Sequence, residues 1–497
     1  MKEIRNRFIY SALGLSLMAL SSAQAEKYEV EDLGKVDTGN FSVAYDINSL
    51  GQVVGSANLV TTYPTEDPEV DLNLETVQGF VVQPGGALAN MGVLQPNLGE
   101  PPEDTEQVTA LARGLNSQLF ALNDSGLAVG YSDNVFAIPP VEGEEGGEGE
   151  EGEESVTTYA IQRYAVQYDG ANLTQIPLPE TATGTVATVI NGSGVIMGYG
   201  NRPFEVDIEG EPAGTFNARR AWYYNPGAAE PFDWLPFPTD PDNVEDPLIR
   251  NTSTIAGINA ANRAIGTADG FPGDDLNFDR AFYYDLGAAE VNALPMVTNR
   301  FHASAEKIND SNLVLVNEYN RFESTTGIFT FQSRGIIHDL VAETQVDIGV
   351  INPDEDHTVA KDINNSGTVV GFARVGERLN RDVYHAFIYD AENGIVDLNS
   401  KIDCDIGWEL LDARAINNAG EIVGLGFYTF DNEDGESVTE RRAFKLTLNT
   451  AEGVTPNTDC VIPNPFRSEG EEGGFLAPNS ALALLMLGIF GSRRKRR

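Results

Sequence analysis

One short sequence unit occurs seven times along the chain, and this repetition constrains the fold more than any other feature. The clearest copy is residues 360–371, Ala-Lys-Asp-Ile-Asn-Asn-Ser-Gly-Thr-Val-Val-Gly. Successive copies lie between 50 residues (Asn259 to Asn309) and 75 residues (Asn48 to Asn123) apart. Such a period is typical of proteins built from repeated structural units. The asparagines that mark the seven copies are Asn48, Asn123, Asn191, Asn259, Asn309, Asn364 and Asn417.

The residues around each asparagine predict a tight β-hairpin. An aliphatic residue precedes each one, and a glycine or asparagine stands three positions later. These two residue types tolerate a positive φ best, so we expect a four-residue loop that ends in a left-handed residue. The asparagine can close this structural turn by bonding its own backbone two residues on. Alternatively, all seven side chains face one rim or channel and bind a polar ligand, although the turn requirement already explains them.

Further strand signals follow each hairpin. In six copies a glycine lies four residues after this expected left-handed residue, whereas the fifth copy has Val316 there. A later strand ends in Asp-Leu or a similar pair, as in residues 395–398 and 337–340. With no long helical periodicity, each unit supplies about four short strands. The third strands carry a small residue before a bulky apolar one, at Gly79-Phe80, Ala165-Val166, Ala221-Trp222, Ala281-Phe282, Gly327-Ile328, Ala386-Phe387 and Ala443-Phe444.

Seven four-stranded units predict an all-β, seven-bladed β-propeller over residues 26–450. The two ends of this region complement each other. Residues 30–34 form a fourth-strand sequence with no hairpin before it, while no such strand follows Phe444. The N-terminal strand can therefore complete the last blade and close the ring, which removes exposed sheet edges. A β-solenoid or a pair of sandwiches would not explain these complementary ends.

The repeats resemble those of the HAF-repeat extracellular proteins, a proteobacterial family of uncharacterised function. The family is named for the tripeptide His-Ala-Phe, present here as His385-Ala386-Phe387. The other copies have Arg220, Arg280, Arg442 or unrelated residues in place of His385. The resemblance covers roughly residues 26–450. It implies an extracellular protein and supplies no catalytic residues.

The N-terminus has the three parts of a secretory signal peptide over residues 1–25. Lys2, Arg5 and Arg7 precede an apolar run, and small residues lead to Ala23-Gln24-Ala25. This Ala-x-Ala pattern is what signal peptidase cleaves, so Ala25 would be the last residue removed. The alternative, an N-terminal membrane helix, would have an apolar run too short to span comfortably.

The C-terminus predicts a second sorting element. Residues 451–474 form a tail and a Glu/Gly-rich spacer, and residues 475–497 form an apolar segment with a basic cluster. This order resembles the GlyGly-CTERM signal, with the pair at Gly473-Gly474, which a rhomboid-type sorting protease processes. The expected path is export, transient inner-membrane anchoring by a transmembrane helix, and then the cell surface or extracellular space. The alternative is a simple tail anchor.

Charge and cysteine content narrow the partners further. The chain has 32 Lys+Arg and 75 Asp+Glu residues, a formal charge of −43, which argues against a nucleic-acid partner. Removing residues 1–25 and 475–497 deletes eight basic residues and one acidic residue, which leaves 24 − 74 = −50. The two cysteines, Cys404 and Cys460, are expected to form one disulfide because an exported protein meets an oxidising compartment.

No catalytic or metal residue is assigned from the sequence. The histidines His302, His338, His357 and His385 lack metal-ligand spacing, and no nucleophile-elbow, phosphate-loop or zinc-protease motif occurs. The acidic tract Glu142–Glu154 and smaller patches at 274–275, 354–356 and 431–434 read as solvated surface. No cofactor is predicted. Calcium is the alternative that clustered carboxylates leave open, without an EF-hand or RTX motif.

Two classes of function follow. The first is a secreted or surface-displayed, non-enzymatic propeller that acts as a binding or interaction scaffold for an unknown extracellular ligand. The alternative is a secreted polysaccharide hydrolase or lyase that uses paired carboxylates from the propeller inserts. Two buried, close carboxylates at one end of the channel would favour the enzyme.

Overall fold

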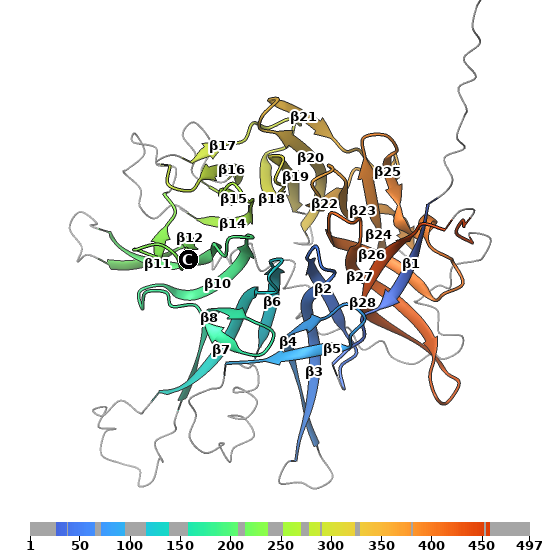
Figure 1. Ribbon diagram of the computed structural model, residues 1–497, viewed down its shortest axis with the longest axis horizontal. Helices are drawn as coiled ribbons and strands as arrows, with labels where there is room; N and C mark the ends of the chain where they lie inside the picture. Colours follow the sequence, from blue (N-terminus) through green and yellow to red (C-terminus); the bar gives the residue numbers. More distant parts are fainter. Residues whose placement is uncertain are drawn as a thin grey trace, which may run out of the picture. The chain divides into compact units, whose positions relative to one another are not determined.

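A computed structural model describes residues 26–36, 38–64, 71–94, 116–138, 158–206, 214–236, 252–269, 278–288, 291–323, 329–378, 381–451 and 454–457. These residues form 28 β-strands in seven four-stranded sheets, together with one short 3-10 helix, η1 (Leu398–Lys401). Figure 1 shows the sheets set around a common centre, each one a blade. The predicted all-β, seven-bladed propeller is therefore confirmed.

Every blade contributes one strand to each of four concentric layers, and the blades are numbered 1 to 7 in the order in which the strands of each layer are given below. The inner strands are β2 (Ser42–Ile47), β6 (Ser117–Leu122), β10 (Thr183–Ile190), β14 (Ser253–Ile258), β18 (His302–Ile308), β22 (Thr358–Ile363) and β26 (Trp408–Ile416). The second strands are β3 (Val53–Pro64), β7 (Ala128–Ile138), β11 (Ile196–Val206), β15 (Arg263–Ala268), β19 (Leu313–Glu323), β23 (Val369–Arg378) and β27 (Ile422–Asp431). The third strands are β4 (Asp71–Val82), β8 (Thr158–Tyr168), β12 (Gly214–Tyr224), β16 (Arg280–Asp285), β20 (Phe329–Asp339), β24 (Arg381–Asp390) and β28 (Ser437–Asn449). The outer strands are β5 (Leu88–Gly92), β9 (Leu173–Gln175), β13 (Phe232–Trp234), β17 (Asn292–Ala293), β21 (Thr344–Asp347), β25 (Gly394–Asp397) and β1 (Lys27–Asp32).

The ring is closed by the N-terminal strand. β1 is the outer strand of blade 7, whose sheet order is β1-β28-β27-β26. The two strands are antiparallel with Asp32 opposite Phe444, and the Leu33 amide donates to the Ala443 carbonyl at 3.1 Å. Figure 1 shows the two ends of the colour scale meeting there, β1 beside β28. The predicted closure is confirmed, and the first and last strands of the propeller lie in one sheet.

Seven apolar cores lie between neighbouring blades, and they explain the small-then-bulky pairs. Successive side chains of a strand point to opposite faces of its sheet. In β24, Phe387 packs into the core shared with blade 5, whereas Ala386 faces the core shared with blade 7. A small residue on the second face lets the inner strand of the next blade approach. In blade 7, the Ala443 amide donates to Ser42 Oγ of blade 1 at 2.9 Å.

In the fifth repeat, the predicted position of the small-then-bulky pair was wrong. The expected pair Gly327-Ile328 lies outside the described residues, and the equivalent pair in β20 is Gly335-Ile336, because Val316 faces Ile336 as Gly371 faces Phe387. Likewise residues 337–340, expected as the fourth strand, end the third strand, and the fourth strand is β21. The Asp-Leu ending at Asp339-Leu340 resembles a fourth strand, but register depends on the partner strand.

The glycine that the fifth repeat replaces is needed for close packing and not for a positive φ. A Cβ on Gly371 would lie 2.1 Å from the Val359 carbonyl oxygen and 2.9 Å from the Phe387 ring. In blade 5, Ile336 stands where Phe387 stands in blade 6, which frees part of the space that Val316 fills. Blade 5 thus departs from the repeat at two coupled positions.

Among the described residues, no helix is long and apolar enough to cross a membrane. The expected transmembrane segment, residues 475–497, lies outside the described part of the chain, as do the signal peptide and the spacer before Gly473-Gly474.

Candidate functional site

The seven repeat asparagines lie at the hairpins that join inner and second strands, on one rim of the propeller. The third residue after each asparagine has φ between 60° and 84°. Each asparagine Oδ1 accepts hydrogen bonds from the amides two and four residues later, at 2.9–3.1 Å. The structure therefore places the left-handed residue and the closing side chain where the repeat pattern expects them.

The same asparagines also join each blade to the next. Each Nδ2 donates to the main-chain carbonyl of the asparagine in the following repeat, at 2.8–3.3 Å, and Asn417 closes the circle onto Asn48 at 3.0 Å. We call this closed circle the asparagine ring. Its members are only 3–8% exposed. Because their oxygens and at least one amide hydrogen of each are already bonded, the ring fastens the blades and offers little to a polar ligand.

In two repeats an asparagine replaces the left-handed glycine, and hydrogen bonds within the asparagine ring explain the replacement. Asn262 Oδ1 accepts from Asn191 Nδ2 at 2.8 Å, and Asn312 Oδ1 accepts from Asn259 Nδ2 at 3.2 Å. Each therefore satisfies the second amide hydrogen of the preceding ring member, which a glycine cannot do.

A charged cluster spans the centre of the propeller next to this ring. It consists of Asp46, Lys307 and Asp362, each two residues before a ring asparagine and each placed at a β-bulge of its inner strand. Lys307 Nζ lies 3.7 Å from both Asp46 Oδ1 and Asp362 Oδ1. Blade 5 carries Lys307 and blade 1 carries Asp46, and these blades are not neighbours. The lysine thus reaches across the central channel.

Both carboxylates of this cluster are also bonded to the next blade. Asp46 Oδ2 accepts from the Leu122 amide at 3.0 Å, and Asp362 Oδ2 accepts from the Ile416 amide at 2.9 Å. Burial raises the pKa of Asp46, although Lys307 opposes the shift. Burial by itself would lower the pKa of Lys307, but the two carboxylates outweigh it and raise this pKa. The cluster acts as an ionic crosslink between inner strands.

His385, the histidine of the His-Ala-Phe tripeptide, lies between blades 6 and 7. Its Nδ1 is 2.6 Å from Asp397 Oδ2, and its Nε2 is 3.6 Å from Glu409 Oε1. Burial alone would lower the pKa of His385, but these two carboxylates raise it to about 9. The imidazole is therefore positively charged at neutral pH and serves as a cation in the interface.

Other blades use the same position as a brace between third and outer strands. Arg334 Nη1 lies 3.5 Å from Asp347, and Arg442 Nη1 lies 3.1 Å from Asp32. In blade 1 the pair is neutral, with Asn90 bonded to Gln78. His385 is thus one of several side chains that fill the same structural position in different blades.

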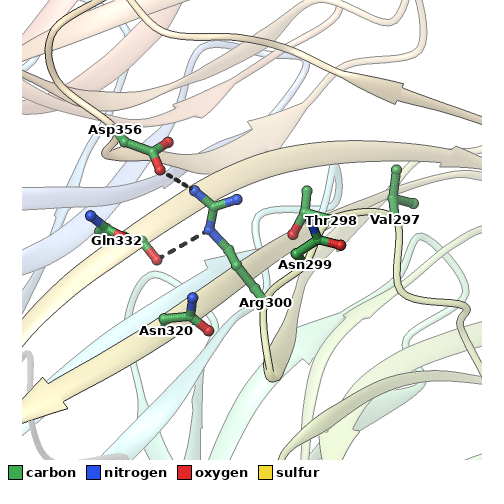
Figure 2. A pocket seen from close by; sticks show the side chains of 7 residues that line it. All are labelled: Val297, Thr298, Asn299, Arg300, Asn320, Gln332 and Asp356. Atoms are coloured by element: carbon green, nitrogen blue, oxygen red, sulfur yellow. Dashed lines mark hydrogen bonds and ion pairs between the residues drawn. The ribbon is translucent and has the colours of Figure 1, made fainter.

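A pocket in the described part of the chain lies at blade 5 on the rim opposite the asparagine ring. It has a volume of about 380 Å³ and is open to solvent. Residues 297–300 of the β17–β18 connector form one wall, Asn320 of β19 and Gln332 of β20 form the floor, and Asp356 from the connector before β22 closes the far side. Figure 2 shows the Arg300 guanidinium between Asp356 and Gln332.

Arg300 is held firmly in this pocket. Its Nη2 is 2.7 Å from Asp356 Oδ2, and its Nε donates to the main-chain oxygen of Gln332 at 3.4 Å. Arg334 binds the other oxygen of Asp356 at 2.7 Å. The Arg300 side chain is 11% exposed, so most of it is buried in the wall of the pocket. Sequence reasoning missed this site, and the one available signal was the irregularity at Val316.

The predicted disulfide is described at one end only. Cys404 is disulfide-bonded, and Cys460 lies outside the described residues. The tail does return to this region, because the Cys404 amide donates to the Asn457 carbonyl at 2.9 Å and the Asn457 amide donates to Asp403 at 2.7 Å. The Cys404–Cys460 pairing stays a prediction.

Arginines partly neutralise the acidic patch at residues 354–356. Glu355 pairs with Arg374 at 3.0 Å, and Asp356 pairs with Arg300 and Arg334. In the described part of the chain, no group of three or more His, Cys, Asp or Glu side chains is arranged to hold a metal ion. The tract 142–154 and the patch 274–275 lie outside that part.

A comparison with protein-family models gives a match. A family model described as "Protein of unknown function (DUF3466)" matches residues 190–494, which is more than half of the chain. No curated protein matches the sequence.

Proposed function

The chain belongs to the DUF3466 family of unknown function, and we propose that it is an exported, non-enzymatic binding scaffold that engages its ligand through the rim opposite the asparagine ring. The observation that carries this proposal is the difference between the two rims. On one rim the repeated polar groups bond to one another around a closed circle. On the other rim, at blade 5, the connectors form a pocket with an ordered guanidinium.

The central carboxylates bear on the alternative, a polysaccharide hydrolase or lyase. Asp46 and Asp362 are buried and lie near one end of the channel, as an enzyme would require. However, Lys307 sits against both, and each also accepts a main-chain hydrogen bond from the next blade. A glycosidase pair instead needs one carboxyl free to protonate the leaving oxygen and the other free to act on the sugar or a water. The contacts therefore favour a crosslink over a catalytic pair.

Export is part of the same proposal. The signal sequence ending at Ala25 and the terminal Gly473-Gly474, apolar and basic elements support processing by signal peptidase and a rhomboid-type protease, followed by display at the surface or release. Intact-mass analysis of the surface or secreted form should give a chain that starts near Glu26 and lacks the basic end. A full-length chain ending at Arg497 and kept in the inner membrane would contradict this part.

The binding role is tested by a screen of the exported form against glycan and protein libraries. A matched pair of variants locates any binding found. Leu50→Ala changes a side chain 60% exposed at a turn of the asparagine ring, and Arg300→Gln changes the pocket. We expect binding to survive the first change and weaken with the second. Conversion of a ligand into products, or no ligand in either library, would overturn the proposal.

A further inference from the structure

Blade 5 differs from the other six at a position where the propeller requires only a small side chain. Glu318 of β19 stands opposite Arg334 of β20. In each of the other six blades, the equivalent residue is the one that pairs with the residue just before the small residue of the third strand. These six residues are Ala57, Ser132, Gly200, Ala268, Ala373 and Gly426. Because six blades fold with alanine, serine or glycine here, the blade itself does not need a glutamate.

The contacts of Glu318 show what it does instead. The residue is fully buried. Its two carboxylate oxygens accept hydrogen bonds from the Val297 and Thr298 amides, both at 2.6 Å. Two residues along β19, Asn320 Oδ1 accepts from the Phe301 amide at 3.0 Å. Blade 5 thus uses two polar side chains to fix the main chain of residues 297–301, which includes the 297–300 wall of the pocket. Such pre-organisation is characteristic of binding sites, because it reduces the ordering that a ligand must impose.

The groups that line the pocket indicate the kind of ligand it takes. Asn320 and Gln332 carry primary amides, which both donate and accept, and Arg300 adds donors beside the Asp356 carboxylate. Planar groups of this kind match pairs of adjacent hydroxyls. Charge is balanced locally, because two arginines (Arg300 and Arg334) face Asp356 and Asp347. A net charge of −43 on the chain also disfavours an anionic ligand.

An aromatic platform, Phe301, directly follows this wall in the chain. Phe301 is 56% exposed and stacks on Phe278, with ring centroids 5.6 Å apart and planes at 18°. A phenyl ring kept in water beside a polar pocket offers its face to an apolar surface of a ligand. Sugars combine such a surface, the C–H face of the ring, with a perimeter of hydroxyls.

We propose that the blade 5 pocket, with Phe301 at its edge, binds a neutral carbohydrate, the pocket groups contacting its hydroxyls and Phe301 its ring face. This inference rests on the proposed function, since it names the ligand class of the same rim. The pocket, at about 380 Å³, lies near the lower end of the roughly 300–1,000 Å³ typical of ligand sites, which suits one or two sugar rings.

The test uses the full-length chain, purified and titrated calorimetrically with neutral oligosaccharides, and with uronic acid-containing and sulfated ones as comparison probes. Gln332→Ala removes an exposed pocket amide and keeps the main-chain oxygen that Arg300 contacts. Phe301→Ala removes the platform. The matched controls are Gln345→Ala and Val341→Ala, exposed residues of the same blade. Gln345 pairs with His338, six residues from Gln332 along β20 and so about 20 Å away.

We expect a neutral oligosaccharide to bind, each pocket variant to raise its Kd at least tenfold, and each control to change it less than twofold. A glycan whose affinity is unchanged by the pocket variants would overturn the inference while the proposed function stands. So would a preference for acidic glycans, or binding of a protein partner alone. If neither glycans nor proteins bind, both proposals fail. Circular dichroism of each variant separates lost binding from lost folding.

Discussion

Replacing one member of the asparagine ring should destabilise the whole propeller, and Asn364 is the most informative site. Asn364→Ala removes the acceptor of the Ser366 and Thr368 amides and the donor to the Asn417 carbonyl of the next blade. Net contributions of about 1 kcal/mol for each of these three hydrogen bonds sum to about 3 kcal/mol. With an unfolding entropy of about 0.9 kcal/mol/K for roughly 420 residues, the thermal midpoint should fall by about 3 °C.

Two further variants separate the turn from the ring. Asn364→Asp keeps the acceptor of the turn but loses the donor and sets a carboxylate against the Asn417 carbonyl. It should therefore still lose about 2 kcal/mol. Asn365→Ala is the control, because it removes an exposed amide of the same turn whose bonds water can replace, and it should change the unfolding free energy by less than about 0.5 kcal/mol. Urea unfolding followed by tryptophan fluorescence gives these values. Wild-type stability of Asn364→Asp would refute the inter-blade role of the ring.

Three other predictions concern the charges and the disulfide. Lys307→Met leaves Asp46 and Asp362 without their cation and should destabilise the protein by about 1–3 kcal/mol at pH 7, a range reduced because Lys307 is 34% exposed. This loss of stability should be smaller at pH 5, and an equal loss at both pH values would contradict the prediction. The pKa of His385 is raised to about 9, so its contribution to stability is complete below its unfolded pKa near 6.5 and is lost as the pH rises through 9. The unfolding free energy should therefore fall by about 2–3 kcal/mol between pH 6.5 and pH 10. His385→Gln should remove this pH dependence, and an unchanged pH dependence in the variant would refute the prediction. Mass spectrometry of unreduced peptides should recover Cys404 linked to Cys460, and finding both as free thiols would reject the pairing.

The architecture was predictable because each repeat carries its own structural requirement. The left-handed residue after each asparagine and the small residue of each third strand are local demands that recur at visible spacing. The complementary ends predicted the place of β1. The small-then-bulky pair of blade 5 was not found from the sequence because Val316 and Ile336 replace the two residue types by which the repeats were aligned.

The sites were less predictable because they depend on which blades the closed ring brings together. Lys307 meets Asp46 across the channel although 261 residues separate them (307 − 46), and no local pattern marks such a pair. The bonds from ring asparagines to the next blade were missed for the same reason. Glu318 follows Val316 by two residues, so the irregular repeat did point to the pocket, but only the fold shows that its carboxylate holds the 297–301 connector.

The division of labour between the two rims is tested most directly by hydrogen–deuterium exchange. The exported form would be measured with and without the tightest-binding neutral oligosaccharide from the glycan library. We predict slower exchange in residues 297–301 and in the β19–β20 strands around Asn320 and Gln332, with no change at the hairpins of the asparagine ring. Protection at those hairpins, with none at blade 5, would contradict it.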